Sequence, residues 1–303
     1  MKAAIHSKRS SGKVLEVVDI DPPVPKPGGV LIRVRAASVN PLDWRLKSHR
    51  PGLDLAGEVV STGSQVTRFN PGDPVFGIGT GAFAEYALAR ESRLAAKPDS
   101  VSFEEAASLP IAGLTALQGL RDRGKLAPGQ KVLINGAAGG VGTFAVQIAK
   151  ALGAEVTGVC SSRNVEMIGL LGADFVVDYT HEDFVQSGKL YDLILDNAAS
   201  RRLSDLRRVM APGGRCVLAG APKQGGETLS RTFEALFRLC ILQKFVFFIA
   251  LPRPKDLEAL AMLVETGKMR PLIDRVYPLG ATGEAIAYLE EGHARGKVII
   301  VPD

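Results

Sequence analysis

The chain has 303 residues, of which 46% are hydrophobic and 23% are charged, and its formal net charge is +5. This composition is ordinary for a soluble globular protein, and the length leaves room for two domains with a substantial core. The basic residues are spread along the chain without an aromatic-interleaved run, which disfavours a nucleic-acid partner.

The cysteines and the apolar segments bear on location. Three cysteines, Cys160, Cys216 and Cys240, share no CxxC spacing, which disfavours a disulfide framework and a structural zinc lobe. The most apolar stretch, residues 233–251, contains charged residues, so we expect a buried helix and strand there and no integral membrane segment. We therefore expect a cytoplasmic protein.

Up to about residue 112 the chain consists of short β-type runs separated by glycine and proline. Apolar residues alternate within these runs, which are "GVLIRVRAASVN", "LAGEVVSTG", "DPVFGIG" and "AFAEYALA". Alternation between turn signals is typical of half-buried strands. The pattern predicts a small, barrel-like, mostly β unit.

From about residue 113 to 251 short apolar runs alternate with helical patterns. Six runs read as strands: "KVLINGA", "EVTGVC", "DFVVDY", "YDLILDNA", "RCVLAG" and "KFVFFIA". Continuous apolar runs separated by helices predict a parallel, doubly wound sheet with both faces covered. After residue 251 a helix, strand, helix and strand are expected.

A glycine-rich segment follows the first of these strands and opens a helix. Its glycines and the residue among them are Gly136, Gly139, Gly140, Val141 and Gly142. Glycine lets a backbone turn sharply and approach a pyrophosphate, whose charge is favoured at a helix N-terminus. The segment predicts a dinucleotide site, the alternative being a tight turn that needs glycine only for packing.

The second strand indicates which dinucleotide is bound. An NAD site usually places a carboxylate at the end of this strand, where it holds the ribose 2′-hydroxyl. Here the strand ends at Cys160 and continues with Ser161, Ser162 and Arg163. This favours NADPH, unless Arg163 is an ordinary surface cation.

Segments along nearly the whole chain together resemble the medium-chain dehydrogenase/reductase superfamily, most closely its zinc-independent quinone oxidoreductase branch. They include "LIRVRAASVNPLDWRLK", "LAGEVVSTGSQVTRFNPGDPVFG", "ASLPIAGLTALQGL", "GAAGGVGTFAVQIAKALGAEVTGVCSSRN" and "EEGHARGKVII". The resemblance implies a central Rossmann domain at 113–251. It also implies a GroES-like catalytic domain built from 1–112 and 252–303.

The resemblance implies site residues as well. Asn40 is similar in position to the residue beside the nicotinamide, where zinc-dependent relatives carry a cysteine. Candidate donors to the substrate oxygen, on which charge develops, are the Asn40 amide and groups of the cofactor or the backbone. Further cofactor contacts are expected at Thr115, Ser161, Arg163, Tyr179, Asn197, Gly220, Phe247, Phe248 and Lys297. Tyr179 could instead be a strand-end aromatic, and the two phenylalanines could be core residues.

The segment at 45–56 is shorter than in relatives and holds no tyrosine, which leaves the substrate pocket in doubt. No three protein ligands converge as catalytic zinc requires, so no metal is expected, and Asp43 and Asp54 are expected to cap turns. The sequence thus predicts a zinc-independent, NADPH-dependent reductase of quinones or α,β-unsaturated carbonyls. Open alternatives are an alcohol dehydrogenase, an enoyl-thioester reductase and a non-catalytic NADPH-binding sensor or scaffold. A homodimer is also left open.

Overall fold

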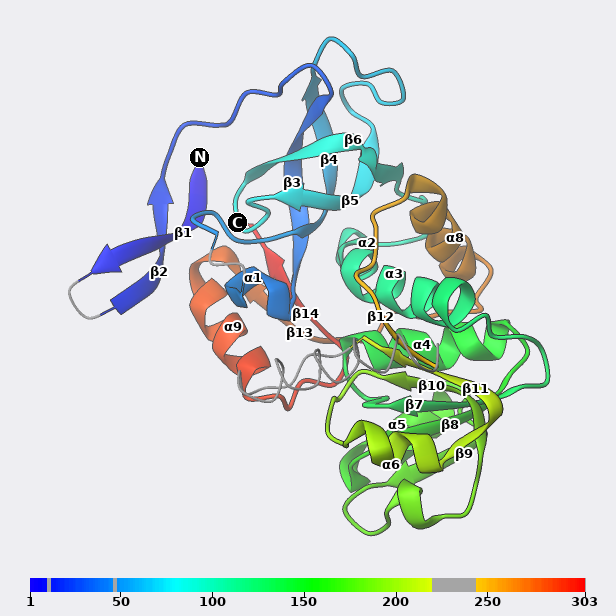
Figure 1. Ribbon diagram of the computed structural model, residues 1–303. Coiled ribbons are helices and arrows are strands. Elements are labelled where there is room, and N and C mark those ends of the chain that lie inside the picture. The colour runs from blue at the N-terminus through cyan, green and yellow to red at the C-terminus, as the bar shows by residue number, and fades with distance from the viewer. Residues whose placement is uncertain (10–11, 46–47, 220–243, 303) are drawn as a thin grey trace. The chain divides into compact units, whose positions relative to one another are not determined.

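The computed structural model describes residues 1–9, 12–45, 48–219 and 244–302 (Figure 1). By its internal contacts the chain forms two compact units. The first consists of Met1–Leu114, Leu251–Gly267 and Pro271–Asp303. The second consists of Thr115–Ala250 and Lys268–Arg270.

The first unit is built mainly from strands. They are β1 (Lys2–Arg9), β2 (Gly12–Asp19), β3 (Gly29–Val39), β4 (Asp54–Thr62), β5 (Pro74–Thr80), β6 (Tyr86–Ala96), β13 (Ile273–Pro278) and β14 (Lys297–Val301). Six of them form one sheet in the order β13-β14-β3-β4-β5-β6, and β3 also pairs with β6. Because β6 pairs back to β3, strands β3, β4, β5 and β6 close into a barrel.

Short helices accompany the barrel. They are α1 (Pro41–Arg45), α2 (Phe103–Ser108), α8 (Pro254–Glu265), the 3-10 turn η4 (Leu279–Ala281) and α9 (Thr282–Glu290). Helix α2 begins with a reciprocal capping box between Ser102 and Glu105. Helix α3 (Pro110–Gln118) starts in the first unit and continues into the second. The GroES-like β domain predicted from the sequence is confirmed.

The second unit alternates strands and helices. Its elements are η1 (Gly119–Arg123), β7 (Lys131–Asn135), α4 (Gly140–Ala151), β8 (Glu155–Cys160), η2 (Ser162–Asn164), α5 (Val165–Leu170), β9 (Phe175–Asp178), η3 (Phe184–Gln186), β10 (Tyr191–Asp196), α6 (Leu203–Arg208), β11 (Met210–Leu218) and β12 (Phe245–Phe247). The six strands pair in parallel in the order β12-β11-β10-β7-β8-β9. This confirms the predicted Rossmann sheet, whose chain order reverses between β7 and β10.

The residues at 268–270 belong to the second unit because a buried glutamine holds them. Gln147 on α4 accepts a hydrogen bond from the backbone N–H of Arg270 at 2.7 Å. Its amide nitrogen donates to the Arg270 carbonyl at 3.0 Å. One side chain thereby pairs both backbone groups of a residue far away in sequence, which a buried segment requires.

Each unit has its own apolar core. In the first, residues of the barrel strands and of α9 are fully enclosed, among them Ile32, Leu55 and Ile300. In the second, residues from β7, β10 and β11 pack with α6, among them Ile194 and Leu206. Within the described part of the chain, no helix is long and apolar enough to cross a membrane.

Candidate functional site

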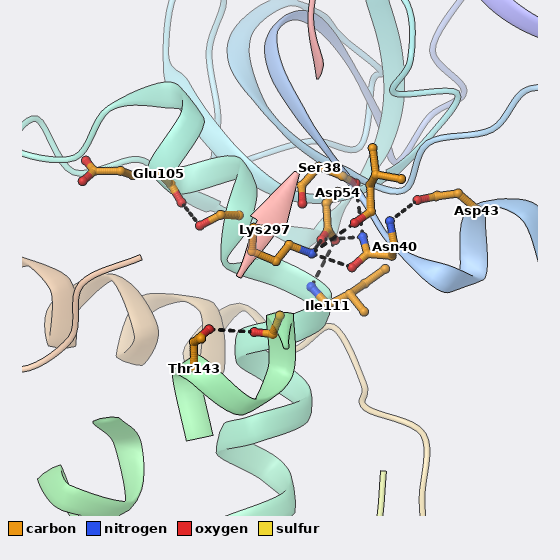
Figure 2. Close-up of polar contacts among 11 residues, drawn as sticks. Ser38, Asn40, Asp43, Asp54, Glu105, Ile111, Thr143 and Lys297 are labelled. Carbon is orange, nitrogen blue, oxygen red and sulfur yellow. Dashed lines mark hydrogen bonds and ion pairs between the residues drawn. The ribbon is translucent and has the colours of Figure 1, made fainter. Parts of the chain in front are cut away.

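Three strands of the first unit bring a buried polar cluster together. Ser38, near the end of β3, is in register with Asp54, the first residue of β4, and Val39 is in register with Val298 of β14. Asn40 directly follows β3 and Lys297 opens β14, so both lie beside Asp54. Figure 2 shows the Lys297 side chain reaching toward Asn40 and Asp54. We call Asn40, Asp43, Asp54 and Lys297 the polar cluster; each is at most 3% exposed.

The hydrogen bonds of Asn40 fix the orientation of its amide. The Lys297 ammonium donates to Asn40 Oδ1 at 2.7 Å, and Asn40 Nδ2 donates to Asp54 Oδ2 at 2.9 Å. An ammonium can only donate and a carboxylate can only accept, so the amide cannot be flipped. Nδ2 also donates to the Ser38 carbonyl at 3.2 Å, which uses its second hydrogen. In this geometry both N–H groups of the Asn40 amide are hydrogen-bonded within the protein, which favours a positioning role for Asn40 over direct donation to a substrate.

Both carboxyl groups of the cluster support backbone. Asp43 accepts a hydrogen bond from the Asn40 N–H at 2.7 Å, next to the start of α1. Asp54 Oδ1 accepts from the Ile111 N–H at 3.0 Å, in the first turn of α3 (Figure 2). The expected capping roles are therefore observed. Asp54 in addition lies 3.9 Å from the Lys297 ammonium.

Burial is the largest cause of the pKa shifts in the polar cluster. It raises the pKa of Asp43 to about 7, with the nearby Asp54 charge adding to the effect and the Asn40 N–H and Lys297 opposing it. Burial likewise raises the pKa of Asp54 to about 6, against the attraction of Lys297. The Lys297 pKa is lowered by burial, although both carboxylates work against this. A charge without water must be paired, and Asp54 and Lys297 pair with each other, whereas Asp43 Oδ1 has no hydrogen-bond partner among the described residues.

The glycine segment forms a loop between β7 and α4. Gly136 has a φ of +79°, which favours glycine. A Cβ at Gly142 would overlap the Gly136 carbonyl oxygen and lie 2.6 Å from the Ala137 backbone. Gly142 is therefore required by close packing of the loop on the helix, and its expected contact with a cofactor stays a prediction.

Gly139 behaves differently from Gly142. It is the exposed N-cap of α4, no side chain caps that helix, and a Cβ there would meet only the Gly136 oxygen at 3.7 Å. Nothing in the protein requires glycine at this position. An open helix N-terminus next to an unobstructed glycine fits a pyrophosphate.

The end of β10 adds a second observation that fits a bound dinucleotide. Asn197 follows β10, and its side-chain nitrogen and oxygen are both enclosed without a hydrogen-bond partner among the described residues. Its neighbour Asp196 is engaged, since it accepts from Asn135 Nδ2 at 2.8 Å and from the Ala199 N–H at 3.0 Å. Unpaired buried amide atoms are costly, so a polar group supplied by a ligand would stabilise them.

The remaining expected cofactor residues mostly follow strands of this sheet. Tyr179 follows β9 and is 58% exposed, and Phe247 ends β12 and is 50% exposed. Phe248 is buried and packs toward Gly119, so it is a core residue, the alternative considered above. Val141 lies in the first turn of α4 and Thr115 in α3. Gly220 lies outside the described residues, and Lys297 belongs to the polar cluster of the first unit.

The end of β8 holds a residue that the sequence analysis missed. Ser161 accepts from Asn164 Nδ2 at 3.1 Å, and Arg163 is exposed in η2. In register beside Cys160 lies Asp178, the last residue of β9. No carboxylate ends the second strand, but the third strand supplies one at the same edge. The acid is visible in "DFVVDY", yet only the strand register places it beside the second strand.

Within the described ranges, no group of three or more histidine, cysteine, aspartate or glutamate side chains is arranged to hold a metal ion. The polar cluster contains two carboxyl groups and one amide, and the cation facing Asp54 is the ammonium of Lys297. Cys160 and Cys216 are buried, and neither forms a disulfide with another described residue.

The raised pKa of Asp43 predicts a pH-dependent contribution to stability. Between the ordinary value of 3.8 and about 7 the folded state holds a proton that the unfolded state has lost, so stability falls as the pH rises through this window. Asp43→Asn keeps an acceptor for the Asn40 N–H and does not titrate. The difference in free energy of unfolding, wild type minus Asp43→Asn, should decline from about pH 4 to about pH 7 and then stay constant. The slope should be at most roughly 1.4 kcal/mol per pH unit. Denaturant unfolding at several pH values measures it, and a constant difference would contradict the assignment.

The two glycines of the loop should respond in opposite ways to substitution. Gly139→Val has room in the protein, so the variant should unfold within a few degrees of the wild type but bind NADPH at least about tenfold more weakly. Gly142→Ala should lower the melting temperature, because its methyl group overlaps backbone. Thermal unfolding and cofactor titration of both variants test this. Wild-type affinity in folded Gly139→Val would remove the loop as the site.

Comparison with known proteins agrees with this architecture. Residues 26–99 match the model of the alcohol dehydrogenase GroES-like domain, and residues 171–300 match that of the zinc-binding dehydrogenases. The chain is 35% identical to a chloroplast envelope quinone oxidoreductase homolog of Arabidopsis thaliana, over 95% of this chain and 94% of that protein. It is 32% identical to an NADPH-dependent alkenal/one oxidoreductase of the same plant, over 100% of this chain and 80% of that protein.

A solved structure gives the same result. The quinone oxidoreductase from Coxiella burnetii superposes with a TM-score of 0.86 at 31% identity, over 99% of both chains. The similarity thus spans both units and the full sequence. The chain belongs to the medium-chain dehydrogenase/reductase superfamily, in its quinone oxidoreductase branch, and is an oxidoreductase that uses a nicotinamide cofactor.

Proposed function

We propose that this protein is a zinc-independent, NADPH-dependent reductase of quinones or α,β-unsaturated carbonyl compounds. The observation that carries the proposal is the glycine loop. Gly139 leaves the N-terminus of α4 uncapped, although the packing of the described residues would also accommodate a side chain at this position. The partnerless amide of Asn197 supports it. The names of the relatives supply the two substrate classes.

The bound cofactor would supply a hydride, and the protein would supply binding, orientation and electrostatics. In the second unit the first turn of α4 would hold the pyrophosphate, and Arg163 would hold the 2′-phosphate. Thr115, Asn197 and Phe247 remain the proposed further contacts. Arginine suits this role because its planar group of donors matches phosphate oxygens.

In the first unit the polar cluster has a positioning role. Lys297 and Asp54 hold the Asn40 amide in one orientation, and Asp54 also holds the first turn of α3. Asn40 therefore acts through its neighbours and does not donate to the substrate. The charge that develops on the substrate oxygen needs other hydrogen-bond donors. We assign the final proton to water, because both Asp54 oxygens accept hydrogen bonds within the protein and Asp43 is buried.

Zinc independence is supported by what occupies the cluster. Asn40 is the residue beside the expected nicotinamide position, and Asp54 is paired with the Lys297 ammonium, so a cation is already present there. A cytoplasmic location is supported by Cys160 and Cys216, which form no disulfide among the described residues.

An activity panel tests the proposal. Oxidation of NADPH, followed by its absorbance, should be fast with quinones or enones and should persist after dialysis against a strong chelator. Turnover confined to alcohols or enoyl thioesters would favour the alternative enzymes on this fold. Cofactor binding without any turnover would favour a sensor or scaffold, and loss of activity on chelation would contradict zinc independence.

Removal of the Arg163 guanidinium tests the cofactor assignment. Arg163→Ala should weaken NADPH binding about ten- to a hundred-fold, the worth of a charge-assisted hydrogen bond, and leave NADH nearly unchanged. Arg207→Ala, an exposed arginine on α6, is the matched control and should change neither. Equal losses for both cofactors would mean that Arg163 is structural.

A further inference from the structure

Asp178 lies where a Rossmann fold recognises the adenosine ribose. That ribose is read at the carboxyl end of the second strand, here Cys160 of β8. Asp178 is in register with Cys160, and the N–H of the next residue, Tyr179, donates to the Cys160 carbonyl at 3.0 Å. The Asp178 charge also contributes, after burial, to raising the pKa of the Cys160 thiol to about 11.

Asp178 ends a chain of hydroxyl groups. Thr180 donates to Asp178 Oδ1 twice, through its backbone N–H at 3.0 Å and through Oγ1 at 2.7 Å. Ser162 Oγ lies 2.7 Å from Thr180 Oγ1. We call these three side chains the hydroxyl relay.

Counting hydrogens gives the relay a direction. A hydroxyl group has one hydrogen, and an ionised carboxylate only accepts. Partial burial alone would raise the pKa of Asp178, but hydrogen bonds from Ser162 and Thr180 and the nearby His181 outweigh this and hold the pKa below its ordinary value. The Thr180 hydrogen therefore points to Asp178, and the single Ser162 hydrogen points inward, to Thr180 Oγ1 or to the Asp178 carboxylate. Ser162, an exposed residue, presents only lone pairs outward.

An outward-facing acceptor discriminates between the two nicotinamide cofactors. The ribose 2′-hydroxyl of NADH can donate to it, whereas a 2′-phosphate offers mainly acceptor oxygens at neutral pH. The Asp178 charge also opposes a phosphate, and the exposed Arg163 attracts it. His181 Nε2 lies 3.8 Å from Asp178 Oδ2 and offsets part of the charge when protonated.

We propose that the relay from Ser162 through Thr180 to Asp178 sets the ratio of NADPH to NADH affinity, by holding Ser162 as a hydrogen-bond acceptor for the ribose. The inference rests on the proposed function, because it concerns the cofactor site of that reaction. In this proposal Arg163 favours NADPH, and the relay reduces the size of that preference. NADH therefore binds as well.

Two variants separate the relay from simple charge repulsion. Asp178→Asn removes the charge but keeps the relay in place, because its amide oxygen can still accept from the N–H and from Oγ1 of Thr180, both of which now donate to the single atom Oδ1. Thr180→Val keeps the carboxylate but interrupts the relay. Thr180→Val should raise the ratio of NADPH to NADH affinity about tenfold, the effect of one hydrogen bond to a charged group, and should raise it more than Asp178→Asn does. Glu155→Gln removes a carboxylate at the opposite end of β8 and should leave the ratio unchanged.

Fluorescence titration of NADPH and NADH against the three variants and the wild type measures the ratio. A wild-type ratio in Thr180→Val would overturn the inference, and a change in Asp178→Asn alone would assign the effect to charge and overturn the relay. Circular dichroism establishes that each variant is folded. Failure of the wild type to bind either cofactor would instead refute the proposed function, so the two failures are distinguishable.

Discussion

The polar cluster of the first unit depends on the pairing of one buried charge, the ammonium of Lys297. An ammonium removed from water is unfavourable unless oxygen atoms surround it, and Asn40, Asp54 and the Val39 carbonyl do so. These partners lie at the ends of neighbouring strands. The need to pair one charge therefore holds the end of β3, the start of β4 and the start of β14 together, and Asp54 extends this to the first turn of α3.

The second unit depends on a different constraint, the close approach of backbone to backbone. Gly142 lets α4 pack directly on the turn that leaves β7, and only a residue without a side chain fits. Gly139, in the same loop, is under no such constraint. The two positions thus favour glycine for different physical reasons. Gly142 is needed for backbone packing, and Gly139 keeps the N-terminus of α4 accessible. The same loop therefore both packs the fold and offers the proposed binding site for the cofactor's pyrophosphate.

The carboxyl ends of the parallel strands collect the polar residues of the second unit. Asn197 follows β10, Arg163 follows β8, and Asp178 ends β9, so three separate segments meet at one edge. Parallel pairing makes this unavoidable, because every strand ends on the same side. In the proposed cofactor site, the choice between NADPH and NADH would accordingly depend on the balance of a guanidinium, a carboxylate and two hydroxyl groups, not on one motif.

Local pattern alone predicted the fold class and most strands of both units, although it missed β1 and β2. Continuous apolar runs separated by helices can be buried only as strands covered on both faces, and a glycine cluster between a strand and a helix has few other uses. The polar cluster and the relay could not be predicted in this way. Asn40 and Lys297 are 257 residues apart, and Asp178 reaches Cys160 only through the pairing of β8 with β9. Which way the Asn40 amide points, and which atom of Ser162 faces outward, depends on partners that only tertiary structure brings within hydrogen-bond distance.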